Sequence, residues 1–266
     1  MSTVDTSPSS NGRAPGAWSE SWTLVRIGRR APGYCRVTFD HPPTNTITAT
    51  TVAELAELVG LIEQDPDLNV VVFDSANPDF YLNHYDTEHD PARTAALSPG
   101  TGMHAWLDLL VRLSQAPVVS IASIRGRVRG AGSEFVMACD MRFASRENAL
   151  LGPFEVGADV VPGDGPPVGL PRLVGRGRAL EILLVADDLD APRAEQYGCV
   201  NRAIADARLD DEVEAMASRL ARFDHDAIAR TKSCVEEMTS FRPGPAARRS
   251  SAAPSPARVA SESRAW

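Results

Sequence analysis

The pattern of apolar and polar positions predicts a folded α/β core over residues 21–174. Residues 22–27 and 34–39 are short runs rich in β-branched and aromatic side chains, which indicate a hairpin-like start. Residues 51–65 carry apolar side chains at helical spacing, and the unbroken apolar run of residues 69–75 is typical of a strand buried on both faces of a parallel sheet. Strands that alternate with helices in this way favour right-handed crossover units.

The rest of the chain divides into a helical region and two polar termini. Residues 103–115 predict a further helix, and residues 117–124 a second buried strand. From residue 175 the pattern is helical in successive segments, so we expect residues 175–241 to form a helical region packed on the sheet. Residues 1–20 and 242–266 are rich in Ser, Pro and other small or polar residues. They hold too little apolar surface to offset the cost of ordering, and we expect a disordered arm and a disordered tail.

Composition and charge narrow the function classes. The chain has 43% hydrophobic and 23% charged residues, as is usual for a globular protein. The formal net charge of -8 offers no basic face for nucleic acid or an anionic membrane, so we expect neither partner. The four cysteines form no CxxC pair, which argues against a zinc site and fits a reducing cytoplasm. With no signal-like apolar segment at the N-terminus, we expect a cytoplasmic protein.

The most informative stretch is a glycine-rich turn that follows a predicted strand. Gly126, Gly130 and Gly132 precede an apolar helix that contains Glu134. Glycines let the backbone approach a ligand closely, and the first N–H groups of a helix suit a phosphate or a developing oxyanion. The sequence has no GxGxxG at this turn, no GxxxxGK[ST] and no GxSxG, which excludes the common nucleotide motifs and a nucleophilic Ser133. The turn therefore predicts an anion or oxyanion pocket beside Glu134.

Structural roles compete with these functional ones. A carboxylate on an apolar helix is costly to bury, so Glu134 has an alternative role as the partner of Arg142 or Arg127 in an ion pair. We expect Asp140 to tie the end of the helix to the next strand. A lysine on a late amphipathic helix, such as Lys232, is commonly just solvated.

Five segments together resemble the crotonase (enoyl-CoA hydratase/isomerase) superfamily. The resemblance runs over about residues 22–240 and implies a spiral of ββα units with a helical C-terminal region, assembled as a homotrimer or hexamer. It also implies a lyase of fatty acid metabolism that acts on an acyl-CoA and binds no permanent cofactor, with coenzyme A entering as part of the thioester substrate. The segments that carry the resemblance are residues 77–86, 125–145, 150–165, 170–204 and 229–237.

The resemblance implies roles for residues of this chain. The thioester carbonyl would lie between the backbone N–H groups of His84 and Ala131, an oxyanion hole for the enolate. Glu134 would take a proton from water while Glu155 supplies a proton to the α-carbon, which converts a 2-enoyl thioester to a 3-hydroxyacyl one. Gly163 would hold the water through its backbone N–H.

Three further positions complete the expected site. Lys232 matches a late basic position that contacts the phosphates of coenzyme A. Tyr81 and Gly130 are expected to contribute to substrate binding. The segment of residues 84–90 is rich in His and acidic side chains, but its spacing fits no metal signature, and we expect a solvated loop and no metal ion.

The sequence departs from the family pattern in ways that keep other functions open. Asn83, His84 and Tyr85 place bulk at the first oxyanion donor, and the chain passes into a polar tail where the family has helices that close the acyl pocket. Asp159 and Asp164 occupy positions that are usually glycine or small. The alternatives are a β-diketone hydrolase that uses Asp164 to cleave a carbon–carbon bond, an enoyl-CoA isomerase, and a non-catalytic homologue that binds acyl-CoA.

Overall fold

The structure of the protein is a computed structural model that describes only part of the chain. The arm and the tail expected at residues 1–20 and 242–266 lie outside the part that it describes. The described residues are 22–86, 93, 96–97, 103–153, 155–158, 162 and 166–239.

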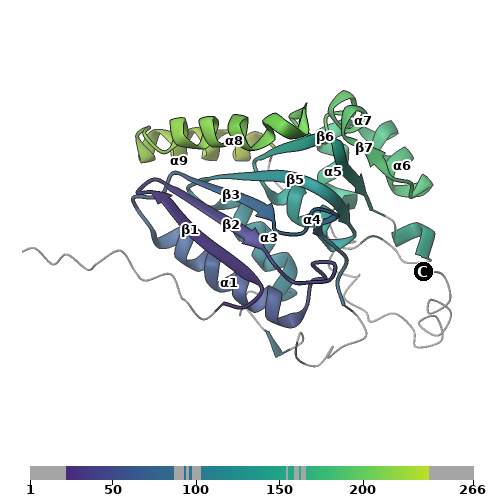
Figure 1. Cartoon of the computed structure of the whole chain (residues 1–266), viewed down its shortest axis with the longest axis horizontal. Coiled ribbons are helices and arrows are strands. Elements are labelled where there is room, and N and C mark those ends of the chain that lie inside the picture. Colours follow the sequence, from purple (N-terminus) through teal and green to yellow (C-terminus); the bar gives the residue numbers. More distant parts are fainter. Residues whose placement is uncertain are drawn as a thin grey trace, which may run out of the picture.

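One sheet organises the described residues (Figure 1). Its strands run in the order β1-β2-β3-β5-β6-β7, while β4 pairs with β5 and β8 pairs with β6. The first two strands are antiparallel, which confirms the hairpin, and β2, β3, β5 and β6 are parallel neighbours. The strands are β1 (Val25–Ala31), β2 (Tyr34–Phe39), β3 (Val70–Ser75), β4 (Phe80–Leu82), β5 (Val119–Arg129), β6 (Met141–Gly152), β7 (Leu189–Asp190) and β8 (Arg202–Ile204).

Helices cover both faces of the sheet, with α1 and α3 on one side and α8 and α9 on the other (Figure 1). Each predicted helical segment has formed, and α7 carries a proline in its first turn, where the missing N–H costs nothing. The helices are α1 (Ala49–Gln64), α3 (Ala105–Gln115), α4 (Ala131–Ala138), α5 (Pro166–Val174), α6 (Arg176–Val185), α7 (Ala191–Tyr197), α8 (Asp206–Leu220) and α9 (His225–Thr239), with a 3-10 turn η1 (Glu155–Ala158).

Strand β3 lies between two hydrophobic cores, which explains its unbroken run of apolar residues. Val71 and Phe73 belong to the core that the sheet forms with α1, α3 and α4. Val70 and Val72 belong to the second core, which the sheet forms with α8. Because successive side chains of a strand point to opposite faces, a central strand between two helical layers needs apolar residues at every position. The prediction of a strand buried on both faces is confirmed.

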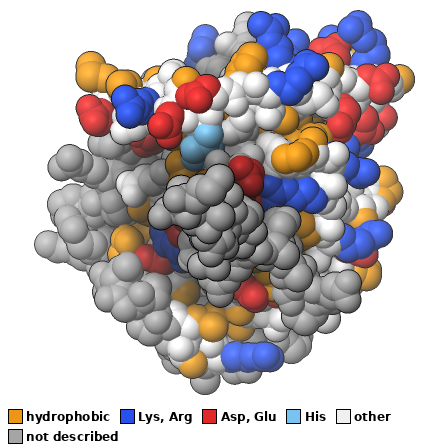
Figure 2. All heavy atoms as spheres, turned by 90° about the vertical axis from the view of Figure 1, so that its left-hand side faces the viewer, with side chains coloured by type: hydrophobic (Ala, Val, Ile, Leu, Met, Phe, Trp, Pro, Cys, Tyr) orange, Lys and Arg blue, Asp and Glu red, His pale blue; other side chains and the backbone are white. Residues whose placement is uncertain are grey.

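The C-terminal region differs from the purely helical one that we expected. It also adds the short strands β7 and β8, which both pair with β6. Helix α8 is fastened to the sheet by ion pairs from Asp206 and Asp210 to Arg125, and from Asp210 to Arg36. On the face seen in Figure 2, the described acidic and basic side chains are interspersed. Much of the surface charge is therefore paired locally.

Candidate functional site

Three neighbouring strands end at one edge of the sheet, and the candidate residues follow those ends. Strand β4 runs parallel to β5, with Leu82 opposite Val128, and β5 runs parallel to β6, with Arg129 opposite Gly152. His84 follows β4, Ala131 and Glu134 follow β5, and Glu155 follows β6. Ligands of parallel sheets bind outside the carboxyl ends of the strands. The topology thus brings all four sequence candidates to the same edge.

A close backbone contact joins the start of α4 to the segment after β4. The N–H of Gly132 donates to the carbonyl of Asn83 at 3.1 Å. A Cβ on Gly132 would lie 2.6 Å from the carbonyl carbon of Leu82, and closer still to its oxygen, so only glycine fits here. This contact sets the backbone of Ala131 beside that of His84, the two residues whose N–H groups we expected to form the oxyanion hole.

The turn into α4 is built by a second glycine. Gly130 has a φ of 51°, in the left-handed region that favours glycine, and no side chain caps the helix. Its carbonyl accepts hydrogen bonds from the N–H groups of Ser133 at 2.8 Å and Glu134 at 3.3 Å. The helix therefore begins directly after β5, and its positive N-terminal end lies at the candidate site.

Glu134 lies in the first turn of α4 and is 7% exposed. The indole Nε1–H of Trp106, in the first turn of α3, donates to its Oε2 at 2.6 Å. A hydrogen-bond donor and the N-terminal end of a helix both favour the ionised form of a carboxyl group. The indole N–H and the end of α4 are thus the two described features that act on the charge of Glu134.

The structure gives Arg142 a different role from the ion pair considered as an alternative. Its guanidinium donates to the backbone carbonyls of Cys139 at 2.6 Å, Cys199 at 2.8 Å and Val136 at 3.2 Å. The buried cation thus fastens the end of α4 to the segment after α7. Its burial lowers the pKa of Arg142 from the usual value.

Glu155 differs from Glu134 in its hydrogen bonding. It opens the turn η1 beyond β6 and is half-buried. Its Oε2 is buried and has no hydrogen-bond partner among the residues that the structure describes. Burial raises the pKa of the Glu155 carboxyl. A carboxyl in this environment keeps its proton more readily than an exposed one.

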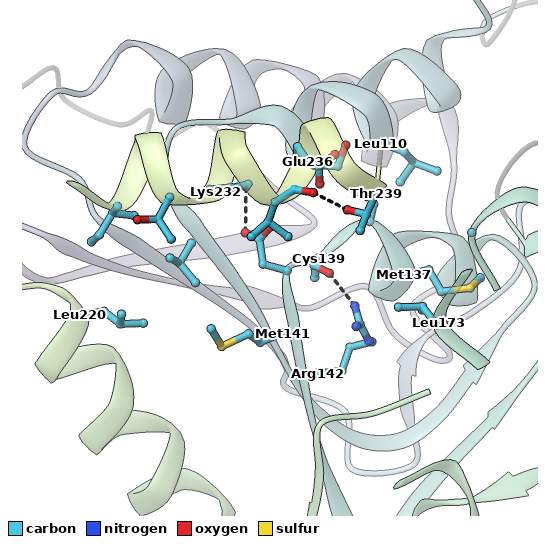
Figure 3. Close-up of a pocket in the computed structure, with 18 of the residues that line it drawn as sticks. Leu110, Met137, Cys139, Met141, Arg142, Leu173, Leu220, Lys232, Glu236 and Thr239 are labelled. Carbon is cyan, nitrogen blue, oxygen red and sulfur yellow. Dashed lines mark hydrogen bonds and ion pairs between the residues drawn. The ribbon is translucent and has the colours of Figure 1, made fainter. Parts of the chain in front are cut away.

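A cavity of about 920 Å³ extends from Glu134 along α4 and beneath α9 (Figure 3). Glu134, Met137 and Ala138 line it from one face of α4, because residues three and four apart lie on the same side of a helix. In Figure 3, Met137 and Leu173 lie close together at one end of the cavity. Most of its wall is apolar, as in sites that hold small molecules.

Lys232, which also lines this cavity, is held by protein groups. Its Nζ donates to Asp140 Oδ2 at 2.8 Å and to the carbonyl of Val118 at 2.9 Å. Asp140 also accepts from the N–H and hydroxyl of Ser120, so it ties the end of α4 to the preceding strand β5 rather than to the next strand, β6, as we had expected. The predicted contact of Lys232 with phosphates would require its ammonium to leave this ion pair.

Tyr81 does not face the site, contrary to our expectation. Its side chain is fully buried, its hydroxyl donates to the carbonyl of Phe73 at 3.0 Å, and its ring packs edge-on against Phe39 at 5.6 Å between centroids. Tyr81 and the next residue of β4, Leu82, both belong to the main hydrophobic core. His84, by contrast, is exposed.

Several residues named from the sequence lie outside the described part of the chain. Asp159, Gly163 and Asp164 fall outside the described residues, as do residues 87–90 of the segment rich in His and acidic side chains. Within the described ranges, no group of three or more His, Cys, Asp or Glu side chains is arranged to hold a metal ion. Of the helices described, none is long and apolar enough to cross a membrane.

Sequence reasoning missed Trp106. The helix that carries it was predicted, but the residue was not singled out. A buried tryptophan usually finds an acceptor for its N–H, which is the one signal that the sequence offered. The acceptor itself, 28 residues further along the chain, becomes visible only when α3 and α4 pack together.

These features define an α/β protein of the crotonase fold, with a glycine-built helix start and a buried carboxylate at the ends of parallel strands. The chain belongs to the enoyl-CoA hydratase/isomerase family, whose sequence model matches residues 29–255.

Solved structures support this assignment. A provisionally assigned enoyl-CoA hydratase from Streptomyces avermitilis is 44% identical, with a TM-score of 0.81 over 87% of this chain and 84% of that one. DspI from Pseudomonas aeruginosa is 26% identical, with a TM-score of 0.76 over 85% of this chain and 92% of that one. An enoyl-CoA hydratase from Mycobacterium smegmatis is 25% identical, with a TM-score of 0.74 over 83% and 85% of the two chains.

Proposed function

We propose that the protein is a lyase that adds water to the double bond of a 2-enoyl-CoA thioester. The observation that supports this most is the contrast between two carboxyl groups at one sheet edge. Glu134 accepts a hydrogen bond from Trp106 at the start of a helix, and Glu155 is half-buried, with an Oε2 that has no hydrogen-bond partner among the described residues. Opposed environments of this kind separate a base from an acid.

The chemistry follows from that separation. Glu134 accepts a proton from water as the water oxygen bonds to carbon 3 of the thioester, and electron density moves onto the carbonyl oxygen as an enolate. Glu155 then gives its proton to carbon 2, which restores the carbonyl and leaves a 3-hydroxyacyl thioester. Glu134 then loses its proton to solvent and Glu155 takes one up from solvent, which restores both carboxyl groups.

The enolate oxygen is stabilised by the backbone N–H groups of Ala131 and His84. The hydrogen bond from Gly132 to Asn83 holds these two segments together. Donors fixed by the backbone act on the charge that develops in the transition state, and each is worth about 3 kcal/mol of the barrier. The acyl chain lies in the apolar cavity that Glu134 lines, and coenzyme A binds only as part of the substrate.

The test is a hydration assay on the purified protein with crotonyl-CoA and with enoyl-CoA thioesters of eight and twelve carbons. Substrate loss and 3-hydroxyacyl product are both measured, and in D2O one deuterium is expected at carbon 2. Glu134→Gln and Glu155→Gln are each expected to lower kcat by about 100-fold to 10,000-fold. The matched control is Glu195→Gln, which changes an exposed carboxyl on α7.

Three results would contradict the proposal. A 3-enoyl product without hydration would identify an isomerase. Equal rates for the wild type and Glu134→Gln would remove Glu134 from the mechanism. Tight acyl-CoA binding with no turnover of any thioester would identify a binding protein.

A further inference from the structure

The hydrogen bond between Trp106 and Glu134 joins two buried groups at the candidate site. Trp106 is 5% exposed and Glu134 is 7% exposed, and the donor and acceptor are 2.6 Å apart. This distance is in the range of a charge-assisted hydrogen bond. The indole is held in place on one side by Phe135, at 6.4 Å between ring centroids, and by the turn that His104 caps.

An indole is an unusual neighbour for a group that moves protons. Its N–H can donate a hydrogen bond but cannot accept one, and it neither gains nor loses a proton in the working range of an enzyme. It therefore stabilises the carboxylate without competing for the proton that the carboxylate takes up. It donates to Oε2, so this oxygen of the carboxylate is held on the side of the indole.

We propose that Trp106 is a positioning residue that keeps Glu134 ionised and fixes the orientation of its carboxylate. This inference rests on the proposed function, because it assigns the residue that makes Glu134 the base of the pair. Glu155, whose Oε2 has no partner among the described residues, lacks such a donor at that oxygen and remains the acid. A tryptophan on α3 thus decides which of two chemically identical side chains takes which role.

The variant that tests the inference is Trp106→Phe, which keeps an aromatic ring and removes the N–H. We expect kcat for enoyl-CoA hydration to fall about 10-fold to 100-fold, with KM little changed, as is typical when a group that orients a catalytic side chain is lost. The acidic limb of the profile of kcat/KM against pH is expected to move to higher pH. The reason is that Glu134 without its donor holds a proton more tightly. A purely structural role of Trp106 would not move this limb.

The chain offers a matched control. The indole of Trp22 donates to Glu57 Oε2 at 2.9 Å on an exposed part of α1. Trp22→Phe makes the same chemical deletion at a carboxylate that has no part in the mechanism. It is expected to leave both kcat and the pH profile as in the wild type.

A second measurement needs neither substrate nor a stable Trp106→Phe protein. The chain has four tryptophans, so the ¹⁵N-labelled protein gives at most four indole N–H signals in its NMR spectrum. The signal that shifts in Glu134→Gln is expected to belong to Trp106, and in the wild type it is expected to titrate with acid as Glu134 gains its proton.

The outcomes of these experiments distinguish a failure of the role of Trp106 from a failure of the proposed hydratase function. An active wild type in which Trp106→Phe has the kcat and pH profile of the wild type overturns the role of Trp106 but leaves the proposed function intact. The absence of an indole signal that responds to both acid and Glu134→Gln overturns it as well. An inactive wild type with a titrating indole overturns the hydratase proposal, while the control of Glu134 ionisation by Trp106 stands.

Discussion

Replacing Gly132 by alanine tests how the anion site is built. The added Cβ would lie 2.6 Å from the carbonyl carbon of Leu82 and 3.2 Å from the carbonyl oxygen of Asn83. Carbon atoms in contact prefer about 3.5 to 4.0 Å, so the overlap is about 1 Å. The atoms that are hit are backbone at the end of β4, which is paired with β5 and cannot rotate away as a side chain would.

The overlap has two measurable consequences. Excess packing of this size typically costs about 1 to 3 kcal/mol of stability, which lowers Tm by about 2 to 12 °C in a protein of this size. A shift of about 1 Å between α4 and the segment after β4 also separates the N–H groups of Ala131 and His84. Misplacement of that size lowers catalysis by about 100-fold, and we expect this loss in kcat/KM for enoyl-CoA hydration.

The control is Gly177→Ala on α6, where an added Cβ meets no atom within 4 Å. It is expected to raise stability by about 0.5 kcal/mol with no change in activity, because alanine restricts the unfolded chain more than glycine does. Both variants are measured by thermal unfolding and by the hydration assay. Wild-type stability together with wild-type kcat/KM in Gly132→Ala would refute the reasoning that this contact holds the two N–H groups together.

Three other variants address neighbouring features of the site. Glu155→Gln should lower kcat by about 100-fold to 10,000-fold yet raise Tm at pH 7. Burial raises the pKa of the wild-type Glu155 carboxyl, so the folded state loses stability as pH rises from the pKa of the unfolded chain to that of the folded protein. Glutamine does not ionise and avoids this loss. The increase in Tm of Glu155→Gln should therefore vanish in thermal melts at a pH below both pKa values. Lys232→Met breaks the ion pair with Asp140 and should lower the free energy of unfolding in urea by about 1.5 to 3 kcal/mol, with KM unchanged. A raised KM at wild-type stability would instead indicate that Lys232 contacts the phosphates of coenzyme A. Thr231→Trp narrows the cavity and should lower kcat/KM for a twelve-carbon thioester more than for crotonyl-CoA. Ser233→Trp, at an exposed position of the same helix, should leave the ratio of the two values unchanged.

Local sequence was sufficient for the parts of the site that a single turn of chain contains. Gly130 and Gly132 ahead of an apolar helix predicted a backbone anion pocket beside Glu134, and the structure places Glu134 at the start of α4 and buried. Glu155 could not be found in this way, because its own loop shows only a cluster of acids among glycines. Its place came from the family resemblance, and the pairing of β5 with β6 is what brings it to the same edge as Glu134.

The sequence by itself determined the elements, because strands repeat every two residues and helices every 3.6 residues, and both periods are visible in a short window. Only the tertiary structure decided what those elements bring together. It paired Trp106 with Glu134 across 28 residues and Lys232 with Asp140 across 92, and it turned Tyr81 into the core. Such contacts depend on how helices and strands stack, which no local period records. The chemistry of Glu134 therefore depends on the packing of α3 against α4.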